Sequence, residues 1–450
     1  MHQPNALGEK SIGKLLWEFS LPAVTGMMVN ALYNVVDSIF VGNGVGDLGL
    51  AAVTIAFPIM TILMAFSMLV GIGATAQISL SIGQKNKVQA ERILGNAFSL
   101  SLIMALLLTV VLLIFLDPIL IVLGAEPAIL PYARDFTQVI VGGSIFSYIG
   151  FGLNNIIRAE GNPKIAMTTM LISAFLNLML NPLFIFGLEM GITGSALATV
   201  ISQAVSAIWV VVYFLGKRGY LKLRLLNLKL DIEITRAIFA IGMSPFFMQL
   251  AASVVTVLYN YSLIAYGGAI AVAAMGIINR VSMLMLMPIF GISQGVQPII
   301  GYNYGAGHYE RVIEALKKAT IAATAVALTG FLLVELFSFQ ITRVFTHNPE
   351  LIKVGAEGMQ MFMSMTPIIG FQIVCSTYFQ AVGKAKQSLL LSLSRQVIIL
   401  IPMILILPSI WGLNGIWLAS PIADIFSSTL TAMFLFREIR GNMRLASIEP

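Results

Sequence analysis

The sequence predicts an all-α integral membrane protein whose twelve transmembrane helices form two six-helix bundles, related by a pseudo-two-fold axis along the membrane normal. Three observations predict this fold class: an apolar composition, twelve apolar runs long enough to cross a bilayer, and a repeat between the two halves of the chain. Of the 450 residues, 58% are hydrophobic and 10% are charged. Globular proteins carry about 25% charged residues. We therefore expect the outer surface to face lipid, because in water it would aggregate.

The apolar runs predict the transmembrane spans. A helix needs about 20 apolar residues to cross the hydrocarbon core of a bilayer. The first run is too long for a cleaved signal peptide and does not end in a small-residue cleavage site, so we interpret it as a retained span. The twelve predicted spans are 15–41, 49–80, 93–116, 131–156, 165–187, 192–216, 237–265, 270–301, 312–338, 352–381, 387–408 and 413–437.

The basic residues predict the orientation of these spans. When both termini and every second loop are placed on one side, that side receives 21 Lys and Arg residues, and the other side receives only Arg134, Arg343 and Lys353. Such an asymmetry is typical of the cytoplasmic side. We therefore expect a multi-pass protein of the inner (plasma) membrane with both termini in the cytoplasm. We expect no nucleic-acid partner, because the positive net charge is explained by basic loops that lie beside anionic lipid headgroups.

The second half of the chain repeats motifs of the first half. Four matches occur in the same order at offsets of 221 to 226 residues, so chance does not explain them. Six spans per half is an even number, so both halves enter the membrane from the same side, which predicts the two-fold axis along the membrane normal. The matched motifs are Ala159–Lys164 with Ala381–Lys386, Gly191–Gly194 with Gly412–Gly415, Pro22 with Pro245, and Tyr33-Asn34 with Tyr259-Asn260.

The repeat also predicts the domain boundaries. Residues 1–216 form the first bundle, residues 237–450 form the second, and residues 217–236 form a basic cytoplasmic linker. Residues 221–234 of this linker alternate apolar with charged side chains. That alternation fits a strand or an interfacial segment, but a basic loop that fixes orientation is the favoured interpretation. Two rigid bundles that rock about a central cleft are typical of carriers with alternating access.

The residue types needed for enzymatic or metal chemistry are scarce. The sequence has one cysteine, Cys375, and three histidines, which are His2, His308 and His347. A single cysteine excludes an internal disulfide, and three scattered histidines do not predict a buried metal cluster. We therefore predict that the protein is no enzyme and has no cofactor.

Five motifs stand out in the two halves: Leu21-Pro22, Tyr33–Gly42, Arg158–Pro163, Gly291–Pro298 and Gly301–Gly307. With these motifs the chain resembles the multidrug and toxic compound extrusion (MATE) family over essentially its whole length, and most of all the bacterial DinF-like branch. This resemblance implies a secondary active antiporter that exports bulky amphipathic or cationic compounds, such as drugs and toxins, in exchange for protons or sodium ions by alternating access. It also implies small-molecule substrates, and we expect a monomer in the bilayer.

A carboxylate in the first span is the candidate coupling group, because ionisable side chains inside a membrane are costly and are commonly functional. Asp37 lies late in that span, Asn177 and Asn181 lie four residues apart in the fifth span, and Thr199 lies in the sixth. If they converge, they form an all-oxygen site, which suits sodium or another hard cation. The family resemblance implies the same grouping. Position 181 is commonly an acid in that branch, so Asn181 leaves the choice between sodium and proton open.

Three charged residues in the second half are further candidates. Arg395 and Asp424 lie in the last two spans, and Arg280 lies in the eighth. Arg395 and Asp424 could form a structural ion pair, or they could recognise the charge of a substrate. The facing of Arg280 stays open at this stage. An acid in the seventh span, which is typical of another branch of the family, is absent between Ala237 and Ala265.

Pro22 is the candidate hinge of the first span. Proline lacks the N–H needed for the helical hydrogen-bond ladder and therefore kinks a transmembrane helix. The kink could be static, or its bend could change with the charge state of Asp37. Pro245 holds the equivalent place in the second half.

A flippase for lipid-linked saccharides, from the same broad superfamily, is the main alternative function. Such a flippase is expected to have a strongly basic cleft for a pyrophosphate headgroup. Here only Arg280 and Arg395 lie near the middle of predicted spans; the other basic residues lie in loops or toward span ends. The sequence therefore favours the exporter.

Overall fold

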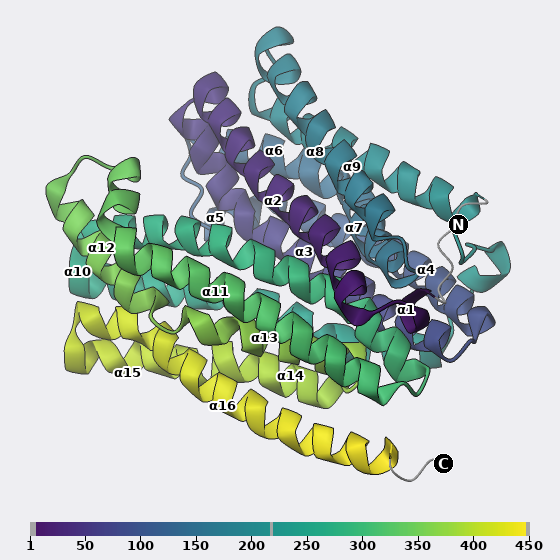
Figure 1. The fold of residues 1–450 in the computed structure, drawn as a ribbon. Helices are drawn as coiled ribbons and strands as arrows, with labels where there is room; N and C mark the ends of the chain where they lie inside the picture. The colour runs from purple at the N-terminus through teal and green to yellow at the C-terminus, as the bar shows by residue number, and fades with distance from the viewer. Residues whose placement is uncertain (1–5, 217–218, 447–450) are drawn as a thin grey trace. The chain divides into compact units, whose positions relative to one another are not determined.

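The computed structural model describes residues 6–216 and 219–446, and all regular elements in these ranges are helical. Figure 1 shows them in chain order by colour. Before the linker the helices are α1 (Ala6–Glu9), α2 (Ile12–Val45), α3 (Asp47–Gly83), α4 (Lys87–Ile114), α5 (Leu116–Val122), α6 (Leu130–Gly142), α7 (Ser144–Ala159), α8 (Pro163–Pro182), the π-helix η1 (Leu183–Gly187) and α9 (Gly191–Leu215). From the linker onward they are the 3-10 helix η2 (Leu225–Leu228), α10 (Ile232–Gly305), α11 (Tyr309–Phe345), α12 (Pro349–Met363), α13 (Thr366–Ala381), α14 (Ala385–Leu393), the π-helix η3 (Ser394–Leu400), α15 (Ile401–Trp411) and α16 (Leu413–Ala446).

The described helices provide the twelve predicted spans. Nine are long and apolar enough to cross a bilayer, and the bent pairs α6–α7 and α12–α13 raise the number to eleven. One of the nine, α10, has 74 residues and is broken at Gly268, where φ is 64°. At a rise of about 1.5 Å per residue it is far longer than one bilayer crossing, so it counts as two spans. The short helix α5 and the break between α6 and α7 were not predicted.

The backbone repeats along with the sequence. The bends of 49° in α6–α7 and of 46° in α12–α13 lie in the fourth span of each half. Backbone positions in the left-handed region recur as well, and glycine adopts that region without the steric cost that a side chain brings. Four such pairs are separated by 221 or 222 residues: Gly46 with Gly268, Lys85 with Gly307, Gly161 with Gly383, and Gly191 with Gly412.

Contacts divide the helices into two compact units. The first contains Thr25–Phe246, and the second contains Lys10–Val24 with the chain from Phe247 onward. Thus α2 changes unit just after Pro22, and α10 changes unit just after Pro245. The start of α10 belongs to the first unit because it lies directly on α3: a Cβ at Gly242 would lie 1.8 Å from the carbonyl oxygen of Leu69. The division at 216 and 237, made from the sequence repeat, stays a prediction.

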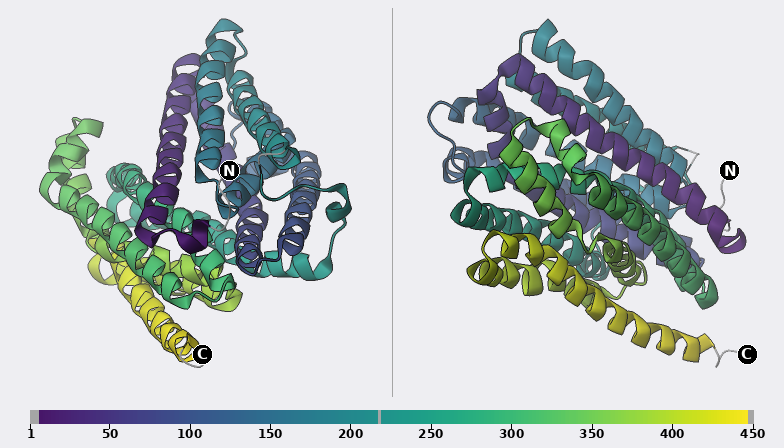
Figure 2. Two further views of the ribbon diagram at one scale, coloured as in Figure 1. Left: turned by 45° about the vertical axis from the view of Figure 1, so that its right-hand side comes forward. Right: turned by 60° about the vertical axis from the view of Figure 1, so that its left-hand side comes forward.

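Each unit has its own apolar core. In the first unit it is formed by small and aliphatic residues of α3 and α4 together with Phe136 and Tyr148. In the second it surrounds the buried Trp417 of α16. Figure 2 shows the helices of each unit from two further directions. The close packing of α8 with α9, and of α16 with η3, positions the candidate site residues.

In the described part of the linker, residues 219–236, the segment 219–231 contains η2 and no strand. A strand was one of the conformations left open for residues 221–234. The last residues of the predicted linker, from Ile232 onward, already belong to α10, so the seventh span begins earlier than predicted.

Candidate functional site: a carboxylate in the first span

Asp37 of α2 accepts hydrogen bonds from two helices of the first unit. Asn181 of α8 donates from Nδ2 to Oδ1 of Asp37. Ser195 of α9 donates from Oγ to the same oxygen at 3.2 Å. Asn181 and Ser195 are fully buried, and Asp37 is half-buried. Neutral donors therefore hold the carboxylate on one side, and its other side remains partly exposed.

The amides continue the network away from Asp37. Asn181 Nδ2 also lies 3.4 Å from Oδ1 of Asn177, and Nδ2 of Asn177 donates to Oγ1 of Thr199 at 3.1 Å. Residues four apart lie on one face of a helix, which explains why Asn177 and Asn181 reach the same neighbours. All four residues predicted for the coupling site are thus joined in one chain of hydrogen bonds.

The local backbone around this network is irregular. Directly after Asn181, α8 passes through Pro182 into η1, a π-helix. Single π-helical turns are common at functional sites. The ring of Phe186 in η1 packs against α2, where it meets the ring of Phe40 edge to face at 6.4 Å between ring centres.

The donor set of the network is rich in oxygen. It offers the two carboxylate oxygens of Asp37, the amide oxygens of Asn177 and Asn181, and two hydroxyls. The Oδ1 atom of Asn181 is buried and has no hydrogen-bond partner in the structure. An orphaned buried acceptor is costly, and a bound cation would satisfy it. Hard cations such as sodium prefer this oxygen chemistry, so these residues fit a sodium ion or, on Asp37, a proton.

Arg395 and Asp424 form a buried ion pair in the described part of the second unit. Nε of Arg395 donates to Oδ1 of Asp424 at 2.6 Å, and Asp424 is almost fully buried. Arg395 lies in η3, the second π-helix. The buried phenol oxygen of Tyr259 has no hydrogen-bond partner, and it is close enough to both residues to interact with their charges.

The remaining predicted residues lie elsewhere. Arg280 is exposed on α10, and no hydrogen bond or ion pair of the described residues involves it. Pro22 is buried in α2, which stays helical on both sides of it. The structure therefore brings Arg395 and Asp424 together but leaves Arg280 apart from them.

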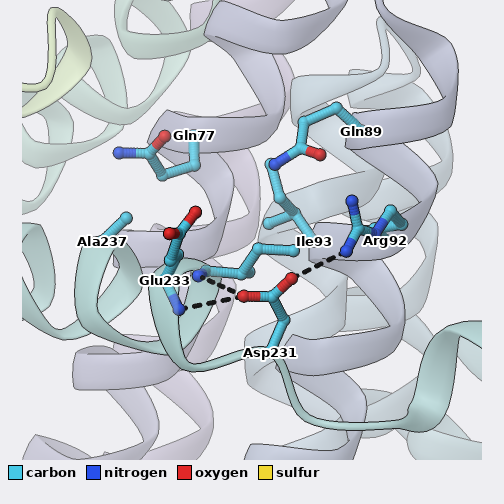
Figure 3. Close-up of a pocket in the computed structure, with 8 residues that line it drawn as sticks. Gln77, Gln89, Arg92, Ile93, Asp231, Glu233 and Ala237 are labelled. Atoms are coloured by element: carbon cyan, nitrogen blue, oxygen red, sulfur yellow. Dashed lines mark hydrogen bonds and ion pairs between the residues drawn. The ribbon is translucent and has the colours of Figure 1, made fainter.

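A small cavity of about 190 Å³ lies where the linker meets α3, α4 and the start of α10. Figure 3 shows that Asp231 joins Arg92 across it, at 2.7 Å. Gln77 and Glu233 lie along the same wall. None of the predicted site residues lines this cavity.

Sequence reasoning missed Ser195 and Tyr259. Ser195 precedes Thr199 by four residues, just as Asn177 precedes Asn181, so a second polar pair at helical spacing was the available signal. Tyr259 was used only as part of a repeat motif. Nothing in the sequence shows that its hydroxyl lies beside the ion pair.

Comparisons with known proteins agree with the resemblance found in the motifs. A family model described as MatE matches the chain twice, at residues 22–183 and 245–406, which is a shift of 223 residues at both ends. The multidrug export protein MepA of Staphylococcus haemolyticus (strain JCSC1435) is 28% identical over 435 residues, covering 97% of this chain and 95% of that protein.

Solved structures are similar over almost the whole chain. The MATE multidrug transporter DinF-BH, solved in complex with a ligand, is 42% identical, with a TM-score of 0.90 and coverage of 97% of this chain and 98% of that one. The outward-facing conformation of a multidrug resistance MATE family transporter of the MOP superfamily is 26% identical, with a TM-score of 0.93 and coverage of 99% of both chains.

Proposed function

Because the chain belongs to the MatE family, we propose that it is a secondary active antiporter that exports bulky amphipathic or cationic compounds in exchange for protons or sodium ions. The family match, the name of the Staphylococcus relative and the descriptions of the two solved structures support the export of drugs. The choice of a cation as the driving species rests on the residues of this chain.

The hydrogen-bonded carboxylate of Asp37 is the observation that carries the proposal. A carboxylate within a transmembrane helix is costly when charged, and binding of a proton or sodium ion removes that charge. Asn181 and Ser195 donate to one of its oxygens, so they hold the empty, ionised form in place. The site would thus alternate between an empty, ionised form and a loaded form without net charge, which a coupling site requires.

Antiport requires that the cation and the substrate weaken each other's binding by the same factor. A coupling of about 1–3 kcal/mol, or about 5-fold to 150-fold in affinity, is typical. We propose that loading Asp37 lets α2 bend further at Pro22, which narrows the substrate site of the N-terminal half and releases the substrate outward. Pro22 lies about four turns before Asp37 on the same helix.

The single carboxylate of the network bears on the choice of ion. Asn181 stands where the related branch commonly has an acid, so Asp37 provides the only negative charge of the hydrogen-bonded group. One carboxylate is sufficient to carry one proton. It holds sodium less tightly than two carboxylates would, because ligand charge raises cation affinity.

The topology of the transporter is part of the proposal. We propose that both termini and the linker lie in the cytoplasm, that the protein resides in the inner (plasma) membrane, and that it works as a monomer. The distribution of 21 against three basic residues between the two sides supports this orientation.

Transport by the purified protein in vesicles tests the function. Export of a fluorescent cationic dye is measured under an imposed proton gradient alone, an imposed sodium gradient alone, and no gradient. Dye movement that follows one gradient supports antiport and names the ion. Dye movement that is equally fast without any gradient would show a passive pathway and contradict the proposal.

A further inference from the structure

The linker is fastened along one face of α4. Asn96 of α4 donates from Nδ2 to the carbonyl of Lys229 at 3.3 Å and accepts from the backbone N–H of Asp231 at 2.7 Å. Ser99, less than one turn further along α4, donates to the carbonyl of Leu228 at 2.8 Å. Side chains of α4 thus form hydrogen bonds with backbone groups of the linker.

The backbone of the linker packs directly against the backbone of α4. A Cβ placed on Gly95 of α4 would lie 2.3 Å from the carbonyl oxygen of Asn227, so a side chain at position 95 would push the linker away. A second anchor holds the beginning of the linker, where the N–H of Leu221 donates to Oε2 of the buried Glu160 at 3.0 Å. Residues 219–236 of the linker are therefore an ordered part of the first unit.

This attachment lies at the level of the predicted membrane span. Gly95, Asn96 and Ser99 fall inside the apolar run 93–116, near the end where the basic loops gather. Ser99 begins a stripe at helical spacing that continues through Ile103, Leu106 and Val110, all of which are exposed. In a membrane-spanning helix an exposed apolar stripe faces lipid. The linker thus lies at one end of the lipid-facing stripe of α4.

The outer face of the linker is both apolar and basic. Leu225 is 87% exposed and Leu226 is 89% exposed, although both are leucines in an ordered 3-10 helix. Ile232, at the start of α10, is 79% exposed. Lys229 and Arg236 are exposed beside them. The left view of Figure 2 shows the linker, in teal, running along the outside of the helices on the right.

We propose that the linker is an interfacial docking segment: its leucines enter the headgroup region of the bilayer, and its basic side chains bind anionic phospholipid headgroups. Apolar side chains flanked by Lys and Arg bind at the membrane interface by this combination. Each basic residue near an anionic surface contributes about 1 kcal/mol, or about fivefold in binding. The proposal needs only a membrane-spanning chain and does not depend on drug export.

Depth-dependent quenching tests the position of the leucines. Leu226→Cys is labelled with an environment-sensitive fluorophore in the full-length protein, reconstituted into phosphatidylcholine vesicles. Wild type, whose Cys375 is buried, serves as the labelling blank. We expect spin-labelled lipid with a shallow label to quench the probe and aqueous iodide to leave it unquenched.

Val88→Cys is the matched control for this experiment. Val88 is also an apolar residue of the first unit and is 72% exposed, but it lies eleven residues before Ser99 on α4, about 16 Å along the helix axis. Iodide is expected to quench this probe. If iodide quenches the probe at position 226 as strongly as the probe at position 88, the leucines face water and the docking proposal is wrong. The leucines would then be available to a protein partner and not to lipid.

The choice of lipid is tested with the same probe at position 226. Spin-labelled phosphatidylglycerol is expected to quench it several-fold more than spin-labelled phosphatidylcholine at equal content. Lys229→Gln with Arg236→Gln should bring that ratio close to one, whereas Lys353→Gln, on the opposite predicted side, should leave it unchanged. Equal quenching by both lipids in the unmodified linker would overturn the anionic selectivity.

Discussion

Asn181 donates a hydrogen bond to the carboxylate of Asp37 across 144 residues of sequence. Ser195 donates to the same oxygen. Neutral hydrogen-bond donors therefore stabilise the charge of Asp37, and this network contains no basic side chain. Such an arrangement stabilises the ionised form moderately and leaves room for a cation. The predictions for the first unit follow from this relationship.

Replacement of Asp37 by Asn is expected to abolish gradient-driven export and to leave the protein folded and inserted. The amide can still form hydrogen bonds, but it can neither bind a proton in this range nor contribute charge to a sodium site. Dye export in vesicles and the thermal unfolding midpoint are the two measurements. Glu335→Gln, at another acid in a predicted span, is the control and should export normally. Normal export by Asp37→Asn would contradict the assignment.

Ser195→Ala is expected to make Asp37 bind a proton more tightly, because the ionised carboxylate loses a stabilising donor. A hydrogen bond to a charged group contributes about 1.5 kcal/mol at the lower end of the usual range, which corresponds to about tenfold in affinity or one pH unit. The measurement is the proton concentration that gives half-maximal export under a proton gradient.

Ser202→Ala is the matched control for Ser195→Ala. Ser202 is equally buried in α9, but its hydroxyl donates back to the carbonyl of Ala198. Its removal should leave the half-maximal ion concentration unchanged. An equal shift in both variants would mean that Ser195 acts only through packing of α9.

Asp424 and Arg395 are expected to depend on each other for stability. Removing one member of a buried pair leaves an unpaired charge and costs about 3–5 kcal/mol. Asp424→Asn and Arg395→Gln should therefore each lower the unfolding temperature strongly, and the double variant should lose less than the sum of the two. The exposed pair of Asp117 and Arg134, at 2.6 Å, is the control and should contribute little to stability, because water screens exposed charges. Additive losses for Asp424 and Arg395 would contradict their coupling.

Pro22→Ala is expected to leave ion binding nearly intact and to weaken the coupling between ion and substrate. Alanine restores the missing hydrogen bond of the ladder and stiffens α2 at the point where it changes unit. Substrate affinity is measured with and without the driving ion. Pro58→Ala, in α3, is the control. If the ion shifts substrate affinity equally in wild type and in Pro22→Ala, Pro22 is only a static kink.

Glu160 is expected to make the linker anchor sensitive to pH. Burial raises the pKa of its carboxyl above the usual 4.5, although the N–H of Leu221 and the hydroxyl of Tyr213 oppose this shift by donating to it. A carboxyl with a raised pKa binds its proton more tightly in the folded state. Its contribution to stability is therefore present below pH 4.5 and is lost as the pH rises through the raised pKa.

The difference in unfolding temperature between wild type and Glu160→Gln measures this effect, because other titrating groups cancel. The variant should gain stability relative to wild type as the pH rises from about 4 to 8. A difference in unfolding temperature that stays constant over this range would show that burial does not raise the pKa of the Glu160 carboxyl.

Local composition was sufficient to predict the spans. A run of about 20 apolar residues becomes a helix in a bilayer because no water is present to satisfy its backbone, and this holds whatever the neighbouring helices are. The twelve spans and the fold class were therefore predicted from the sequence, with ends that differ by a few residues.

Contacts between helices could not be predicted in the same way. The sequence placed Asp37, Asn177, Asn181 and Thr199 on candidate helix faces, but their hydrogen bonds depend on how α2, α8 and α9 rotate and pack. Ser195 was missed for this reason: a serine in an apolar helix commonly bonds its own backbone, as Ser202 does. Only packing shows which of the two serines reaches a carboxylate.

The sequence by itself determined a duplicated, twelve-span membrane protein, its family resemblance and the group of polar residues around Asp37, because these depend on composition and spacing along the chain. Tertiary structure alone decided that Ser195 completes this group, that Tyr259 lies beside the pair of Arg395 and Asp424, and that the linker follows α4 with its leucines exposed. The physical reason is that hydrogen bonds and close backbone contacts form between residues distant in the sequence, and helix packing sets which of them meet.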